Sequence, residues 1–393
     1  MKEKLNLGTI ILLGSFLLGI FGGMEIVEVL KNFLSAAIDP ATLQIVGIIF
    51  LILVLGNLLH ISGGLRKINL SLETFIKSRR LTLVIPSILM GLLPVPAGAM
   101  LSAPIVEESG NKMELNAEVK TFLNYWFRHI WEYVWPIYPG LILAVTILDV
   151  PLHRLVITQL PLSLTAVCVG YLFGVRRIPI EKSRSSNDVQ HFFKGVYTFA
   201  LNAWPILAII VLVLILKLNL ILSLSLIVIF TFLTLKVMKE KVFSISSVIK
   251  NSLPWKTILL VVAVMVFKKI LQNSDFLSVI PEIFNRLGIS PLITLFFIPF
   301  FIGLLTGLTM VFVGICFPLF SALIGIKEPN LTYAMLIYVG GFSGVLLSPV
   351  HLCLVTTVDY FKASFVKVYR LLILPVCCVV AVAFTFVFLQ RIF

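Results

Sequence analysis

Charged residues are scarce in this chain of 393 residues. Asp, Glu, Lys and Arg together make up 12% of it and hydrophobic residues 59%, whereas soluble domains average about 25% charged and about 45–50% apolar residues. This scarcity excludes an ordinary soluble domain. Apolar runs at 7–23, 42–59 and 371–389 are long enough to cross the hydrocarbon core of a bilayer. The sequence therefore predicts an all-α, polytopic membrane protein.

Signatures of enzymes and nucleotide-driven pumps are also missing. The chain contains no GxxxxGK[ST] loop and no HExxH pair, so neither ATP binding nor zinc-dependent proteolysis is indicated. Ser348 and His351 lie close in sequence, but Ser348 is not part of a GxSx motif. We expect no catalytic residues and no enzyme activity.

Cysteine is rare, and its spacing indicates no metal site. The five cysteines form no CxxC pair and no Cys/His spacing typical of zinc ligands, and all lie within apolar runs: Cys168, Cys316, Cys353, Cys377 and Cys378. We interpret them as small hydrophobic residues.

The charges that are present favour the basic side, with 31 Lys and Arg against 18 Asp and Glu. They sit in short loops between apolar runs, where basic residues set membrane orientation, so we expect no nucleic-acid partner. Basic residues at the N-terminus and in the loops near 66–80 and 176–184 predict a cytoplasmic N-terminus. The first apolar run is expected to be an uncleaved span of a multi-pass protein of the inner, cytoplasmic membrane.

Prolines and glycines interrupt the apolar segments in a pattern that occurs twice. The matched pairs are Pro86 with Pro299, Gly91 with Gly303, Pro104 with Pro318, and Pro136 with Pro349. Such breaks are tolerated in a bilayer only where the backbone is buried in protein or lines a cavity. Matched breaks in two halves are typical of the binding site of a transporter built from inverted repeats.

The loops divide the chain into two five-element repeats of opposite orientation, each with a re-entrant hairpin and a broken span. The predicted first repeat, 1–178, has spans 7–34 and 42–64, hairpin 81–106, broken span 119–148 and span 152–175. Residues 179–218 hold a polar linker and a connecting span that inverts the second half. The predicted second repeat, 219–393, has spans 219–237 and 254–271, hairpin 290–324, broken span 331–358 and span 368–390.

Ionisable residues concentrate in the first broken span. Asn124, Arg128, Glu132 and Trp135 follow a helical i, i+4, i+8, i+11 spacing, with His129 beside them. Ionisable groups inside a span are costly and usually functional, so we assign substrate binding to this group and ion coupling to Glu132. The alternative is an Arg128–Glu132 pair that neutralises itself and only holds the helix together.

Polar residues also gather at the hairpin tips and in the second broken span. We assign substrate binding to Pro94, Pro96, Gly98, Ser343, Ser348 and His351, and ion coupling to Thr306, Gly307 and Thr309. No metal site is firm, although sodium could bind hydroxyls of Thr306, Thr309 and Ser348. The alternatives are that the hydroxyls bond to their own helical turns and that His351 is a core histidine.

A hairpin followed by a span broken at proline resembles the ion transporter superfamily, which includes divalent anion/sodium symporters. GLLPVPAGAMLSAP, NYWFRHIWEYVWPIYPG and LSPVHLCL together resemble the DUF401 family. The resemblance implies an elevator-type carrier, commonly dimeric. It places sodium and substrate at Pro94 to Ala99, Trp135 to Pro139, Thr306 to Thr309 and Ser348 to His351. Anion symporters carry a Ser-Asn-Thr motif at both tips, whereas this chain has PVPAG at one tip and TGLT at the other. We therefore consider proton coupling through Glu132 as a substitute for sodium coupling.

These observations predict a secondary active transporter for a small, anionic solute, coupled to sodium or protons, with no other cofactor. Its expected partners are the lipid bilayer, the solute and a second copy of the chain. The alternative is a sodium/proton antiporter in which Glu132 binds the exchanged ion.

Overall fold

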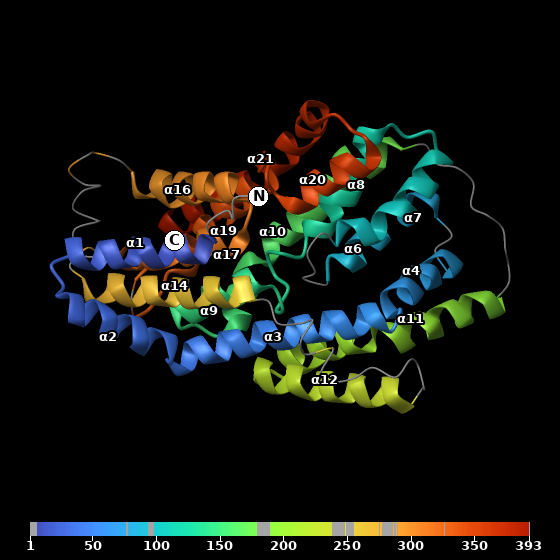
Figure 1. Cartoon of the computed structure of the whole chain (residues 1–393). Helices are drawn as coiled ribbons and strands as arrows, with labels where there is room; N and C mark the ends of the chain where they lie inside the picture. The colour runs from blue at the N-terminus through green and yellow to red at the C-terminus, as the bar shows by residue number, and fades with distance from the viewer. Residues whose placement is uncertain are drawn as a thin grey trace, which may run out of the picture.

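The computed structural model describes residues 6–75, 78–92, 98–178, 189–237, 255–274, 290–325 and 327–392, with the single residues 248, 276, 286 and 288. Within these ranges all regular secondary structure is helical (Figure 1). Five helices are long and apolar enough to span a membrane: Pro40–Ile61, Leu152–Phe173, Phe192–Ile215, Leu220–Val237 and Phe365–Gln390. The predicted all-helical chain with membrane-spanning segments is confirmed for this part.

The first predicted span, residues 7–34, is two helices rather than one. Helix α1 (Leu7–Phe21) ends at Gly22, and α2 (Ile26–Ala37) starts a new direction. Gly23 adopts a φ of 82°, a left-handed conformation that glycine reaches without a Cβ clash and that commonly ends helices. The expectation of a continuous span was wrong because this glycine pair stops the helix.

Helices from the first and second halves of the chain pack against each other. α1 lies against α14 (Trp255–Asn273), and α12 (Leu220–Val237) lies against α3 (Pro40–Ile61), as Figure 1 shows. The first helix of each half therefore contacts the second long helix of the other half. Outside them, α11 (Val189–Ile210) packs on α4 (Gly64–Phe75) and continues into the π-helical turn η2 (Val211–Ile215).

The rest of each half consists of short helices and one long helix. The first half has α5 (Arg79–Thr82), α6 (Ile85–Met90), α7 (Ala99–Asn111), α8 (Ala117–His129), α9 (Pro139–Leu148), α10 (Leu152–Phe173) and η1 (Val175–Arg177). The second has α16 (Pro291–Thr306), α17 (Thr309–Leu319), α18 (Ser321–Ile324), α19 (Leu331–Leu346), α20 (Leu352–Phe361) and α21 (Phe365–Ile392).

The central helices also exchange partners between halves. α6 and α7 pack against α8, and α7 also packs against α20; α16 and α17 pack against α19, and α17 also packs against α9. Figure 1 shows α6, α7, α8 and α20 grouped away from α16, α17 and α19. The predicted broken spans correspond to α8 with α9 and to α19 with α20. α7 therefore contacts the first helix of one broken span and the second helix of the other, and α17 does the same with the two spans exchanged.

Two matched glycines permit close backbone approach in these groups. A Cβ on Gly91 would collide with the carbonyl oxygen of Arg128, and a Cβ on Gly303 would collide with that of Gly341. Gly340 and Gly344 extend the second contact, where α16 and α19 pack backbone to backbone. Small residues allow this kind of helix contact inside membranes.

Candidate functional site

The interruption between α8 and α9 places the predicted ionisable residues at a helix end. α8 stops at His129, and α9 starts at Pro139. The predicted helical stripe is therefore wrong beyond Arg128, because Glu132 and Trp135 belong to the nine-residue interruption (130–138). Pro136 and Pro139 lack amide donors and disfavour helical conformation in the residues before them.

Arg128 and Glu132 form a buried ion pair at this break. Their side chains are 3% and 8% exposed, and Nη1 lies 3.8 Å from Oε1. Their i, i+4 spacing joins the last turn of α8 to the non-helical segment rather than two turns of one helix. Both charges are held inside the protein, which is costly unless each has partners.

A tyrosine hydroxyl from the other half of the chain bonds to this break. Tyr338 of α19 donates to the backbone carbonyl of Glu132 at 2.8 Å. Tyr125 of α8 donates in the opposite direction, to the carbonyl of Leu346 at the end of α19, at 3.0 Å. Both tyrosines are buried. The Leu346 carbonyl lies in the last turn of α19, where carbonyls lack intrahelical partners, and the Glu132 carbonyl lies in the interruption after α8.

The start of α17 completes one side of the site. Its first residue, Thr309, has its hydroxyl 3.5 Å from Oε2 of Glu132, at the outer limit of a hydrogen bond. A Cβ on Gly140, the second residue of α9, would press against the Thr309 side chain. The N-termini of α9 and α17 therefore meet beside the carboxylate.

Residues from the second break reach the same place. His351, which precedes α20, lies with Nε2 3.2 Å from Nε2 of His129, and His129 Nε2 lies 3.7 Å from Oε1 of Glu132. Cys353 joins the two histidines, so that one ligand atom from each of the three lies within 4.8 Å of the other two. The structure thus brings His129, Glu132, Thr309 and His351 together, all of which were predicted site residues.

Cys353 is the residue that sequence reasoning missed. It was interpreted as a small hydrophobic residue because no cysteine shows a zinc-type spacing. The only local signal was the His351-Leu352-Cys353 sequence directly after a break. His129, the third member, lies more than 200 positions earlier and is brought close only by packing.

The predicted substrate-binding residue Asn124 is hydrogen-bonded to neighbouring helices. Its side chain is fully buried, its Oδ1 accepts from the Ser87 and Ser102 hydroxyls at 2.9 and 2.6 Å, and its Nδ2 donates to Ala99 at 2.9 Å. This amide therefore cross-links α6, α7 and α8. Its described hydrogen bonds are all to protein.

The remaining polar side chains of the predicted site differ in whether they have a hydrogen-bond partner within the protein. Thr306 donates to the carbonyl of Ile302, one turn earlier, and Ser348 accepts from the amide of Val350. In contrast, the Ser343 hydroxyl and the Trp135 indole N–H are buried with no hydrogen-bond partner among the described residues. Because buried polar groups are normally satisfied, these two are the better candidates for contact with a polar ligand.

The two predicted hairpin tips differ in what the structure describes. Pro94 and Pro96 lie outside the described residues, and Gly98 is buried at the start of α7. At the second tip, Gly307 adopts a φ of 64° between α16 and α17. Its carbonyl accepts a 2.8 Å hydrogen bond from Nδ1 of His351, which connects the tip to the second break.

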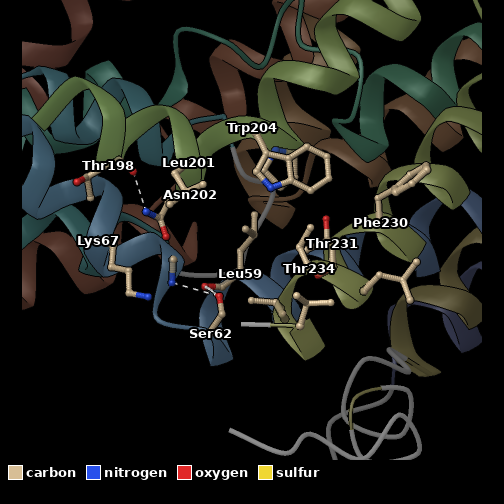
Figure 2. Close-up of a pocket in the computed structure, with 15 residues that line it drawn as sticks. Leu59, Ser62, Lys67, Thr198, Leu201, Asn202, Trp204, Phe230, Thr231 and Thr234 are labelled. Carbon is tan, nitrogen blue, oxygen red and sulfur yellow. Dashed lines mark hydrogen bonds between the residues drawn. The ribbon is translucent and has the colours of Figure 1, made fainter. Parts of the chain in front are cut away.

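A separate groove of about 450 Å³ lies among α3, α4, α11 and α12. Figure 2 shows Leu59, Trp204 and Phe230 around it, with the Asn202 amide donating to the Thr198 carbonyl at 2.7 Å. None of the predicted site residues lines this groove.

Comparison with known proteins agrees with part of the predicted resemblance. The search of curated proteins returns no match. A family model described as a protein of unknown function (DUF401) matches residues 1–390, almost the whole chain. The chain therefore belongs to the DUF401 family.

Proposed function

We propose that this protein is a secondary active transporter of a small, anionic solute, coupled to sodium or protons. The observation that carries the proposal is the buried Arg128–Glu132 pair, which lies at a helix break. Leucines in these positions would hold a helix together at lower cost, and ionisable groups inside apolar segments usually mark a substrate or ion path.

The exchanged contacts support the further proposal of an inverted repeat over 1–178 and 219–393. If two halves are related by a pseudo-twofold axis, a contact between one helix of the first half and a different helix of the second half must have a counterpart. In the counterpart, the equivalent helices make the same contact with the two halves exchanged. The packing of α1 on α14 and of α12 on α3 fits this rule, as do the contacts of α7 with α20 and α17 with α9. The pairs α6/α7 and α16/α17 would then be the re-entrant hairpins, and α11 the extra span that inverts the second half.

This architecture supports the proposal that the chain belongs to the ion transporter superfamily. Transport would proceed by an elevator movement in a homodimer in the cytoplasmic membrane, with the N-terminus in the cytoplasm. In the site, Arg128 and the N-termini of α9 and α17 supply positive charge for an anion. Glu132 would exchange the proton, and hydroxyls of Thr306, Thr309 and Ser348 are oxygen ligands available to sodium.

The test has two stages, because the solute must be found first. Purified protein is screened by thermal shift against carboxylates, oxyanions, arsenite, sodium and lithium, since a ligand stabilises the fold that binds it. Uptake of the stabilising solute is then measured in proteoliposomes. Arg128→Ala should abolish uptake while the protein stays folded, and Arg154→Ala, at an exposed position in α10, should transport normally. Full uptake by the Arg128 variant would overturn the arrangement.

A cation/proton antiporter is the second candidate. The observation that favours it is that the Glu132 carboxylate faces both a hydroxyl, from Thr309, and an imidazole, from His129. In vesicles with a pH-sensitive dye, sodium alone should collapse a proton gradient if the protein is an antiporter. An anion transporter should require the solute as well.

A further inference from the structure

We infer that His129, His351 and Cys353 form a binding site for a transition-metal ion that prefers sulfur and nitrogen ligands. Zinc(II) and copper(I) are the ions that fit this set of ligands. One ligand atom from each residue lies within 4.8 Å of the other two. The set of two imidazoles and one thiol is a donor combination that zinc and copper use in proteins.

The hydrogen bonds of the two histidines decide which ring nitrogens are available. Nδ1 of His129 lies 2.6 Å from the carbonyl of Tyr125, and Nδ1 of His351 lies 2.8 Å from the carbonyl of Gly307. A carbonyl oxygen can only accept, so each Nδ1 must be the donor and carry the hydrogen. In the neutral rings, both Nε2 atoms are therefore bare acceptors.

These two acceptors face each other at 3.2 Å. Two lone pairs at that distance repel unless a cation lies between or beside them. Tetrahedral zinc, with Zn–N bonds of about 2.0–2.1 Å, holds two nitrogen ligands about 3.3 Å apart. Donation from the other ring nitrogen to a backbone carbonyl is also how metal-binding histidines are commonly oriented.

The charges around the cluster suit a cation. Once Cys353 ionises to bind metal, its thiolate and the Glu132 carboxylate together exceed the single positive charge of Arg128. Oε1 of Glu132 is 3.7 Å from Nε2 of His129, so the carboxylate is near enough to move in as a fourth ligand. His129 and Cys353 are buried while His351 is half-buried and follows the exposed Val350, so the cluster lies nearest the protein surface on the His351 side.

The inference does not rest on transport, and its test needs no gradient. The purified full-length chain in detergent is equilibrated with Zn²⁺, with Cu⁺ under reducing conditions, or with Mg²⁺, and bound metal is measured by mass spectrometry after removal of free ion. We expect one zinc or copper ion per chain and no retained magnesium. Cys353→Ser and His351→Gln should each weaken binding at least 10-fold, the order of magnitude for damage to a metal site.

Matched controls are available elsewhere in the chain. Cys316→Ser changes a buried cysteine of α17, and His60→Gln an exposed histidine of α3; both should bind like the wild type. Cobalt gives a readout that needs no variant, because a bound thiolate produces a charge-transfer band in the near ultraviolet. Absence of that band from the cobalt-loaded wild-type chain, or equal binding by the Cys353 and Cys316 variants, would overturn the site.

Discussion

Tyr125 and Tyr338 make reciprocal hydrogen bonds across the two halves of the chain. Tyr125 donates to the carbonyl of Leu346 at the end of α19, and Tyr338 donates to the carbonyl of Glu132 just beyond α8. The two tyrosines are 213 positions apart, the same separation as Pro86 and Pro299. Each half therefore holds the broken helix of the other in place with the same side chain.

Removing either hydroxyl should have a similar effect on stability. Tyr125→Phe and Tyr338→Phe each leave a buried carbonyl without its partner, which should lower the free energy of unfolding by about 1–3 kcal/mol. Tyr369→Phe is the matched control, because its buried hydroxyl has no partner among the described residues. Thermal melts in detergent should show two clear decreases and no decrease for the control; equal melting of all three variants would contradict the assignment.

The matched glycines should be intolerant of a methyl group. Gly91→Ala and Gly303→Ala each push a Cβ into a backbone carbonyl of the neighbouring helix, and overpacking of this kind costs about 1–3 kcal/mol. Gly14→Ala in α1 meets no atom within 4 Å and should be neutral or slightly stabilising. The measurement is the melting temperature of the purified variants together with their yield of monodisperse protein.

The buried ion pair should show strong coupling in a double-mutant cycle. Glu132→Gln leaves the Arg128 charge buried without its carboxylate partner, which should cost about 3–5 kcal/mol. Adding Arg128→Met removes that charge, so the double variant should be more stable than Glu132→Gln alone. Additive effects of the two substitutions would show that the charges do not interact.

Asn124 should be important for folding even where no solute is present. Asn124→Ala removes an acceptor shared by two serine hydroxyls and a donor to Ala99, which should lower stability by at least about 2 kcal/mol. Ser87→Ala removes one donor only and should have the smaller effect. Denaturation of both variants without ligand checks this order, and an Asn124→Ala variant of unchanged stability would favour the original assignment to substrate.

Glu118 makes stability depend on pH at the start of α8. Hydrogen bonds to backbone amides, its own first and that of Ser364 at 3.4 Å, together with Lys367, hold the pKa of this carboxyl below its usual value of 4.5. Because the folded pKa is lowered, the stabilisation is present above the unfolded pKa and is lost as pH falls through the folded one. Glu118→Gln should therefore melt slightly lower than wild type at pH 7, by less than about 1 kcal/mol, and the difference should vanish in acid.

The sequence by itself determined the class of the protein and where its helices break. Composition requires apolar helices, and proline and glycine act on the backbone of their own neighbours, so the breaks near Pro136, Gly307 and Pro349 could be located in advance. The expected single span over residues 7–34 failed for the same local reason, because the Gly22–Gly23 pair ends α1.

Only the tertiary structure decided which polar groups meet. Asn124 and Glu132 share a predicted helical face, yet Asn124 is bound within its own half and Glu132 lies beside Thr309 and Tyr338 of the opposite half. Cys353 joins His129 across more than 200 positions of sequence. Contacts of that separation depend on how whole helices pack, and side chains at non-helical breaks follow no periodicity from which such contacts can be deduced.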